Sequence, residues 1–136
     1  MSRVSFTIPG KPFGKQRPRA TRRGQIYTPA ETVSFERQVG MIARPHFPKP
    51  MTGPVRLTIR AVFALPASWS KRKAAEHLHQ PHTQRPDGDN VTKAIKDALN
   101  RIAWVDDAQV AEWAGSKTWG LRNETIVIVE PISGEL

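Results

Sequence analysis

An alternation of apolar and polar side chains at residues 55–63, broken only at Val62, places the strongest constraint on the fold. Apolar residues occupy every odd position of this stretch, and arginine or threonine occupies three of the four even positions. Successive side chains of a β-strand point to opposite faces. The pattern therefore predicts a strand over 55–65 with one buried face, and a chain with such a strand must build a sheet and cover one side of it.

The remaining periodicity predicts further strands and helices. Strands are predicted at 4–9, 108–119 and 124–130, with a turn at 122–123 between the last two, and helices at 29–43, 71–79 and 90–101. The order β-α-β-α-α-β-β indicates the α+β class, with a small mixed β-sheet and flanking helices. A length of 136 residues suits a single domain spanning 1–136.

The first helix is predicted from its N-terminal signal. Thr28 stands at the N-cap position and Glu31 three residues later, which is the spacing of a capping box. The apolar residues that follow, Val33, Val39 and Met41/Ile42, outline the face expected to be buried.

Composition excludes several classes of protein. The chain has no cysteine, which rules out disulfides, thiolate zinc sites and thiol nucleophiles. No run of 18 apolar residues is present, so no membrane-spanning helix is expected. The first residues lack the apolar core of a signal peptide. These features predict a soluble, cytoplasmic protein.

The charge is unevenly distributed. The formal net charge is +9, but the first 86 residues carry +13 and the last 50 carry −4. A strongly basic segment favours a polyanionic partner, such as nucleic acid or an anionic membrane surface. All five aspartates lie between residues 87 and 107, whereas the glutamates are spread over the rest of the chain. Short carboxylates confined to one segment suit metal ligation.

Residues 85–99 form the segment in which catalytic chemistry is predicted. Asp87 and Asp89 are two residues apart, so in an extended segment both carboxylates would point the same way. Lys93 follows on the predicted helix, one turn beyond Asp89, and Asp106-Asp107 adds a second carboxylate pair. Oxygen ligands of this kind suit Mg²⁺, which would activate water and neutralise charge in phosphodiester hydrolysis.

Simpler interpretations of these residues remain open. An Asp-x-Asp pair before a helix can be a turn with an N-cap. Lys93 and Asp97 have the spacing of an ordinary surface ion pair on a helix, and Asp106-Asp107 can be a turn. The conjunction of these elements, with every aspartate recruited, is what points to a metal site.

The second functional element is a basic loop within residues 10–24. Proline and glycine keep it open, and its cations suit contacts with phosphate backbones. These cations are Lys11, Lys15, Arg17, Arg19, Arg22 and Arg23. The alternative is a solvated run of charge. Phe13 and Tyr27 are expected to pack locally, the histidines at 77, 79 and 82 to lie at the surface, and the four tryptophans to lie in the core or an interface.

Three motifs carry a family resemblance. They are Arg85-Pro86-Asp87-x-Asp89-Asn90-x-x-Lys93-x-x-x-Asp97-Ala98-Leu99, then Trp104-x-Asp106-Asp107-Ala108-Gln109-Val110, and Gly10-x-Pro12-x-x-Lys15-Gln16-Arg17-Pro18-Arg19 followed by Tyr27-Thr28-Pro29. On these residues the chain resembles the RusA family of Holliday-junction resolvases.

The resemblance implies a homodimeric, Mg²⁺-dependent endonuclease that nicks four-way junction DNA at symmetric positions, in recombination and repair. It implies that Asp87, Asp89 and Asp107 bind the metal and act in catalysis, and that Lys93 is essential. Members are often encoded by prophages, and no small-molecule cofactor is implied. A non-catalytic basic nucleic-acid-binding protein, or a nuclease acting on other branched DNA, remains the alternative.

Overall fold

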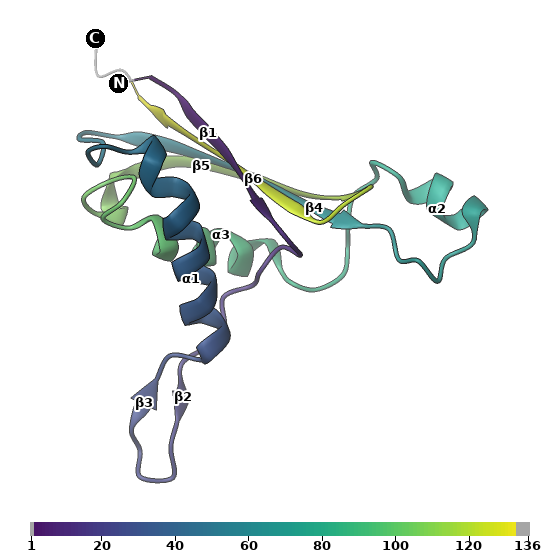
Figure 1. Ribbon diagram of the computed structural model, residues 1–136, viewed down its shortest axis with the longest axis horizontal. Coiled ribbons are helices and arrows are strands. Elements are labelled where there is room, and N and C mark those ends of the chain that lie inside the picture. Colours follow the sequence, from purple (N-terminus) through teal and green to yellow (C-terminus); the bar gives the residue numbers. More distant parts are fainter. Residues whose placement is uncertain (1, 133–136) are drawn as a thin grey trace.

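The computed structural model describes residues 2–132 and places its two longer α-helices on one face of a four-stranded sheet, with a short third helix beyond the end of the sheet (Figure 1). The elements are β1 (Val4–Pro9), β2 (Arg19–Ala20), β3 (Ile26–Tyr27), α1 (Ala30–Ala43), η1 (Arg44–His46), β4 (Val55–Ala64), α2 (Lys71–His77), α3 (Gly88–Leu99), η2 (Asp107–Gln109), β5 (Val110–Gly120) and β6 (Glu124–Pro131). The predicted α+β class with a small mixed sheet is confirmed. None of the helices within 2–132 is long and apolar enough to cross a membrane.

The order of strands in the sheet is β1-β6-β4-β5. β4 pairs antiparallel with β6 and parallel with β5. The last two strands therefore do not form the hairpin that a turn at 122–123 suggests, because β4 lies between them. Parallel neighbours require a long crossover connection, and the segment carrying α2 and α3 supplies it between β4 and β5.

Strand β4 follows its sequence pattern closely. Its odd positions from Val55 to Phe63 are at most 2% exposed, while Arg56 and Arg60 are exposed on the opposite face. Helices α1 and α3 lie on the apolar face (Figure 1). This face carries the core, and its continuation onto β5 forms one wall of the cleft described below.

Helix α1 buries only part of the predicted apolar face: Val39 is fully buried and Ile42 packs against the core. Val33 is 44% and Met41 71% exposed, whereas Thr32, Gly40 and other small residues are buried. A Cβ at Gly40 would lie 3.6 Å from a methyl carbon of Ile102, just beyond α3, so this side of α1 is closely packed. Close approach to Ile102 therefore places small side chains beside Val39 on the buried face of α1.

The predicted capping box of α1 is wrong. The helix begins at Ala30, its N-cap is Pro29, and no side chain donates or accepts a capping hydrogen bond there. The chain enters α1 directly from β3, so Thr28 lies in the link between a strand and the helix.

Helix α3 confirms the helix predicted at 90–101 and buries one apolar stripe. Val91, Ile95 and Leu99 are at most 2% exposed and Ala98 is 6% exposed. The helix begins at Gly88, two residues before the predicted start, with Asp87 as its N-cap. This early start decides where the aspartates of the motif point.

At the end of the basic loop and just after it, the structure forms a short hairpin that the sequence did not predict. Strands β2 and β3 pair antiparallel and project away from the sheet (Figure 1). The turn is closed by hydrogen bonds between Thr21 and Gln25, and Gly24 has a φ of +80°, which glycine tolerates better than other residues.

Candidate active site

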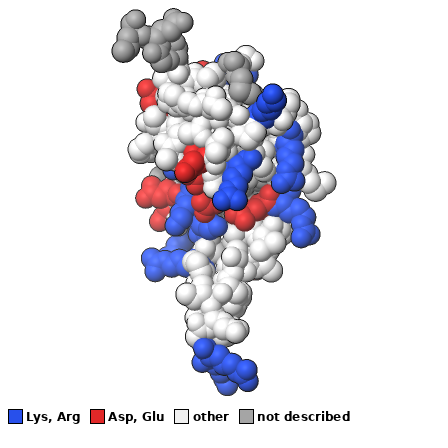
Figure 2. Space-filling view, turned by 90° about the vertical axis from the view of Figure 1, so that its left-hand side faces the viewer, with Lys and Arg blue, Asp and Glu red and all other residues white. Residues whose placement is uncertain are grey.

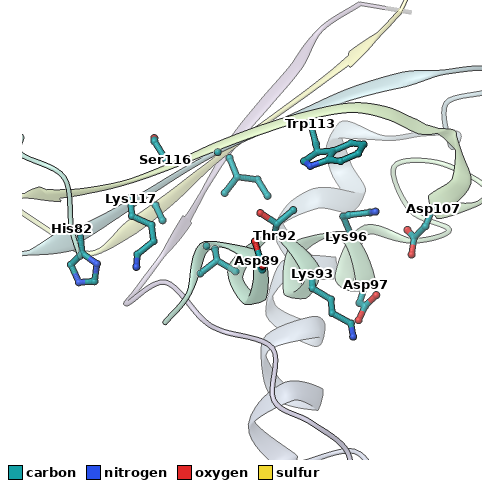
Figure 3. Close-up of a pocket in the computed structure, with 15 residues that line it drawn as sticks. His82, Asp89, Thr92, Lys93, Lys96, Asp97, Asp107, Trp113, Ser116 and Lys117 are labelled. Atoms are coloured by element: carbon teal, nitrogen blue, oxygen red, sulfur yellow. The ribbon is translucent and has the colours of Figure 1, made fainter. Parts of the chain in front are cut away.

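A cleft of about 790 Å³ lies between helix α3 and strand β5 (Figure 3). Most of the charged and aromatic side chains that line it come from three elements. They are Asp89, Lys93, Lys96 and Asp97 from α3, Asp107 from η2, and Trp113 and Lys117 from β5, and His82 joins them from the loop before α3. The cleft therefore gathers carboxylates and ammonium groups that are up to 28 residues apart in sequence.

The early start of α3 separates Asp87 from Asp89. A helix turns by about 100° per residue, and Asp89 is already in its first turn. Asp89 lines the cleft, whereas Asp87 lines a neighbouring cavity of about 650 Å³ formed with the basic loop. The extended geometry that would point both carboxylates the same way is therefore absent.

The two adjacent aspartates after Trp104 have different partners. Asp106 caps η2 by accepting a hydrogen bond from the backbone N–H of Ala108 at 3.0 Å. Gln109 completes a capping box, because its Oε1 accepts from the N–H of Asp106 at 2.9 Å. Asp107 instead lines the cleft. The interpretation of this pair as a turn is thus correct for Asp106 and incomplete for Asp107.

A buried tryptophan orients Asp107. The indole N–H of Trp104, a side chain with no exposed surface, donates to Oδ1 of Asp107 at 2.8 Å. The side-chain amide of Gln109 donates to the carbonyls of Met51 and Gly53 and thereby fixes η2 to the segment before β4. These contacts hold the carboxylate of Asp107 in one orientation and leave its second oxygen available to a ligand.

Lys93 does not form the surface pair that its spacing from Asp97 allows. Asp97 instead binds the ammonium of Lys15 at 3.1 Å, and Glu36 lies 3.5 Å from the same ammonium. Within residues 2–132 no ion pair engages Lys93, which is exposed at the cleft. Its ammonium is therefore available to an anion.

The basic loop is fixed to the start of α3. The backbone N–H of Lys15 donates to the carbonyl of Asn90 at 2.9 Å. A Cβ at Gly14 would lie 2.6 Å from the Cβ of Pro86, so only glycine allows this approach. Lys15 is partly buried by its two carboxylate partners, while Arg17 is exposed.

The other arginines of the loop lie on the projecting hairpin. Arg19 lies in β2, and Arg22 and Arg23 lie in the turn; all three are exposed. Figure 2 shows cationic side chains at the end of this projection and a mixture of acidic and basic side chains over the body.

His82 closes one end of the cleft and is buried, which corrects its expected surface position. Its ring stacks on Phe63 at 3.6 Å between centroids and tilts against Trp119 at 4.4 Å. Burial and the nearby charge of Lys117 lower the pKa of His82 below 6.5. The imidazole is therefore neutral at neutral pH.

The donor set of the cleft suits a hard cation. Asp89 and Asp107 supply carboxylate oxygens, and Mg²⁺ in proteins is commonly held by one or two carboxylates with waters and a substrate phosphate. Over residues 2–132 no group of three or more His, Asp or Glu side chains is assembled as a metal cage. The residues present fit a cation that is held by few carboxylates and whose coordination a substrate phosphate would complete.

Sequence reasoning missed three side chains of the cleft. Lys96 and Lys117 were not selected, and Trp113 was assigned to the core or an interface, although it is 66% exposed. The alternation of side chains along β5 was the available signal, because the odd-numbered residues of this strand share one face of the sheet. Trp113 and Lys117 share the sheet face of Leu57, to which Trp113 is paired.

Comparison with known proteins assigns the family. The family model described as endodeoxyribonuclease RusA matches residues 9–130. A similar protein, YqaN of Bacillus subtilis (strain 168), described as uncharacterized, is 34% identical over 98% of this chain and 99% of its own length. The match spans the basic loop, the cleft, β4, β5 and all of β6 but its last residue, whereas β1 contributes only Pro9 to it. The chain belongs to the RusA family of endodeoxyribonucleases, which are hydrolases acting on DNA.

Proposed function

We propose that this protein is a Mg²⁺-dependent, structure-selective endonuclease that resolves four-way DNA junctions by paired symmetric nicks in recombination and repair. The observation that carries the proposal is the cleft between α3 and β5. Three carboxylates line it together with Lys93 and Lys96: Asp97 is paired with Lys15, whereas no ion pair among the described residues engages Asp89 or Asp107. This combination suits a phosphodiester, which needs its negative charge neutralised before water can attack.

In this proposal Asp89 and Asp107 hold the cation. Asp87, at the N-cap of α3 beside the cleft, is proposed to join them as a ligand or to orient the water. When bound, the cation supplies Lewis-acid polarisation of the phosphate and lowers the pKa of a coordinated water.

The chain's own residues do the remaining work. Lys93, which lacks a carboxylate partner among the described residues, contributes a charge-assisted hydrogen bond to a phosphate oxygen as negative charge develops. Trp104 keeps Asp107 in its orientation, so the carboxylate does not reorganise during the reaction.

The basic loop is proposed to bind the DNA backbone. Lys11, Arg17, Arg19, Arg22 and Arg23 are exposed, and cations at these positions would release counterions on binding. Lys15 already bridges Asp97 and Glu36, so its first role is to hold the loop against α1 and α3.

A homodimer is part of the proposal because of the symmetry of the substrate. Resolution of a four-way junction requires two nicks in strands of like polarity. A two-fold dimer presents two identical sites to a two-fold substrate, whereas one chain offers a single cleft with these carboxylates among its described residues.

The test is cleavage of a labelled four-way junction by the purified protein. Cleavage in Mg²⁺ that stops in EDTA, and that Asp89→Asn abolishes while junction binding persists, is expected. Undiminished cleavage by Asp89→Asn would reject the site. Binding without nicking by the wild type would favour the non-catalytic nucleic-acid-binding protein, and equal cleavage of flap and linear duplex DNA would reject junction selectivity.

A further inference from the structure

Trp113 is the one tryptophan whose environment differs from the other three. Trp104 and Trp119 are buried, and Trp69 is half-buried against Trp119 and His77. The side chain of Trp113 is 66% exposed, although it lies on the sheet face that elsewhere forms the core. A single exposed apolar residue is common on protein surfaces and does not by itself indicate a function. A functional argument for Trp113 must therefore come from where its side chain lies.

The indole of Trp113 lies in the cleft that holds the proposed catalytic groups. Figure 3 shows it on β5 above α3, with Lys96 and Asp107 at the same end of the cleft. Gly115 follows two residues later on the same face and adds no side chain, so the wall beside the indole stays open. The ring therefore presents its surface to whatever enters the cleft.

We propose that Trp113 stacks on a nucleobase next to the phosphate that is cut, and so positions that phosphate. The inference rests on the proposed function, because it assumes that a DNA strand enters this cleft. Every nucleobase has a π-face, so an indole can stack on any sequence. A stacked base beside Lys96 and Asp107 fixes the register of the strand relative to the carboxylates.

The charge around Trp113 favours a nucleotide over a protein surface. Lys93, Lys96 and Lys117 line the same cleft as Asp89 and Asp107. The cores of protein–protein interfaces are depleted in Lys and Asp, because burying such charges is costly. A nucleotide offers a flat apolar base for the indole and an anionic phosphate for the lysines.

The first measurement is tryptophan fluorescence in the Asp89→Asn variant, which is expected to bind the junction without cutting it. Addition of four-way junction DNA should quench part of the emission. Trp113→Phe in the same background should remove that quenching, whereas the control Trp69→Phe should retain it because Trp69 packs away from the cleft on Trp119. Quenching that persists in Trp113→Phe would overturn the proposal.

The second measurement is cleavage kinetics with the catalytic aspartates intact. Trp113→Ala should lower kcat/KM by roughly tenfold or more, with an unchanged melting temperature because the side chain is exposed. Trp113→Phe should recover most of the loss, since a phenyl ring also stacks. An abasic nucleotide beside the cut phosphate should make wild type and Trp113→Ala equal. A Trp113→Ala variant that cuts an intact junction like wild type would overturn the inference.

Two outcomes separate this inference from the function on which it rests. If wild type cuts junctions and Trp113 variants change neither quenching nor kinetics, stacking is rejected and the nuclease assignment stands. If wild type cuts nothing in Mg²⁺ but DNA quenches Trp113, stacking stands and the nuclease assignment fails. A loss of dimer mass in sedimentation of Trp113→Ala would show that protein covers the indole, and would also overturn the inference.

Discussion

Two consecutive aspartates serve different purposes, and a matched pair of substitutions separates them. Asp106→Asn and Asp107→Asn remove the same charge from neighbouring positions. Asn is a good N-cap, so Asp106→Asn should keep the hydrogen bond to the N–H of Ala108 and leave cleavage near wild type. Asp107→Asn should lower the rate of junction cleavage by on the order of 100-fold or more.

Stability measurements complete this comparison. Asp107→Asn can still accept from the indole of Trp104, so its melting temperature should match wild type. Asp106→Ala loses the cap and should lower the free energy of unfolding by about 1 kcal/mol, or the melting temperature by a few degrees. Equal cleavage by Asp106→Asn and Asp107→Asn would contradict the division of roles.

The buried His82 makes stability depend on pH. Its pKa is lowered in the folded state, so the native protein binds fewer protons than the unfolded chain at mildly acidic pH. The free energy of unfolding should therefore fall as the pH drops below 6.5, and the loss should level off below the folded-state pKa. His82→Phe preserves a ring between Phe63 and Trp119 but cannot titrate.

Thermal melts at pH 7.5 and 5.5 check this expectation. The drop in melting temperature on acidification should be smaller in His82→Phe than in wild type. His46→Phe is the matched control, because His46 is exposed and also stacks on an aromatic ring, that of Phe6. An equal drop in wild type and His82→Phe would contradict the assignment.

At the residue scale the sequence identified side chains that the fold brings together, but not how each of them is oriented. Spacing and residue type led to Asp89, Lys93 and Asp107, which the fold brings to one cleft. An Asp-x-Asp pair does not predict the separation of Asp87 from Asp89. The two side chains point the same way only if both residues are extended, and here the helix begins at Gly88, between them. Lys117 and Trp113 were missed because their place depends on the pairing of β5 with β4.

At the scale of elements, the strength of the local pattern explains what could be predicted. β4 and α3 carry strong periodicity and lie within two residues of their predicted starts. The β2–β3 hairpin has two-residue strands, too short for any alternation to be detected. The face of α1 was only partly right: Val39 is buried, but packing against α3 and Ile102 also buries small residues, a tertiary effect that local hydrophobicity does not contain.

The projecting hairpin should contribute affinity for DNA without contributing to the stability of the core. Arg22 and Arg23 lie in its exposed turn, so replacing both by alanine removes two cations far from the sheet. The slope of log affinity against log salt should become shallower by about 2, at roughly 0.9 per phosphate contact. Binding measured by anisotropy between low and moderate salt gives the slope.

The control removes the same charge from another exposed element. Lys71→Ala with Arg72→Ala on α2 lowers the net charge equally, and should leave the slope nearly unchanged if α2 does not touch DNA. Equal slopes for the two double variants would show that the hairpin acts only through overall charge.

At the scale of the whole molecule, the net charge of +9 hides two opposed distributions. The basic first 86 residues include the loop and hairpin, whereas the acidic segment 87–107 includes the aspartates of the cleft. The basic part attracts a phosphate backbone, whereas the aspartates of the acidic segment would repel it unless a bound cation or Lys93 offset that repulsion. The fold joins the two parts directly, since Lys15 of the loop binds Asp97 of α3.

The final prediction concerns the number of cuts per binding event. If a two-fold dimer places one cleft on each of two strands, a mixed dimer of one wild-type and one Asp89→Asn subunit should cut only one. On a supercoiled plasmid that extrudes a cruciform, paired nicks give linear DNA, whereas a single nick relaxes the plasmid to a nicked circle and removes the junction. Mixed dimers carrying two different affinity tags should therefore yield nicked circles, and wild-type dimers with the same two tags should yield linear plasmid. Linear product from mixed dimers would contradict one site per subunit, and a monomeric mass for the junction-bound protein would contradict the dimer.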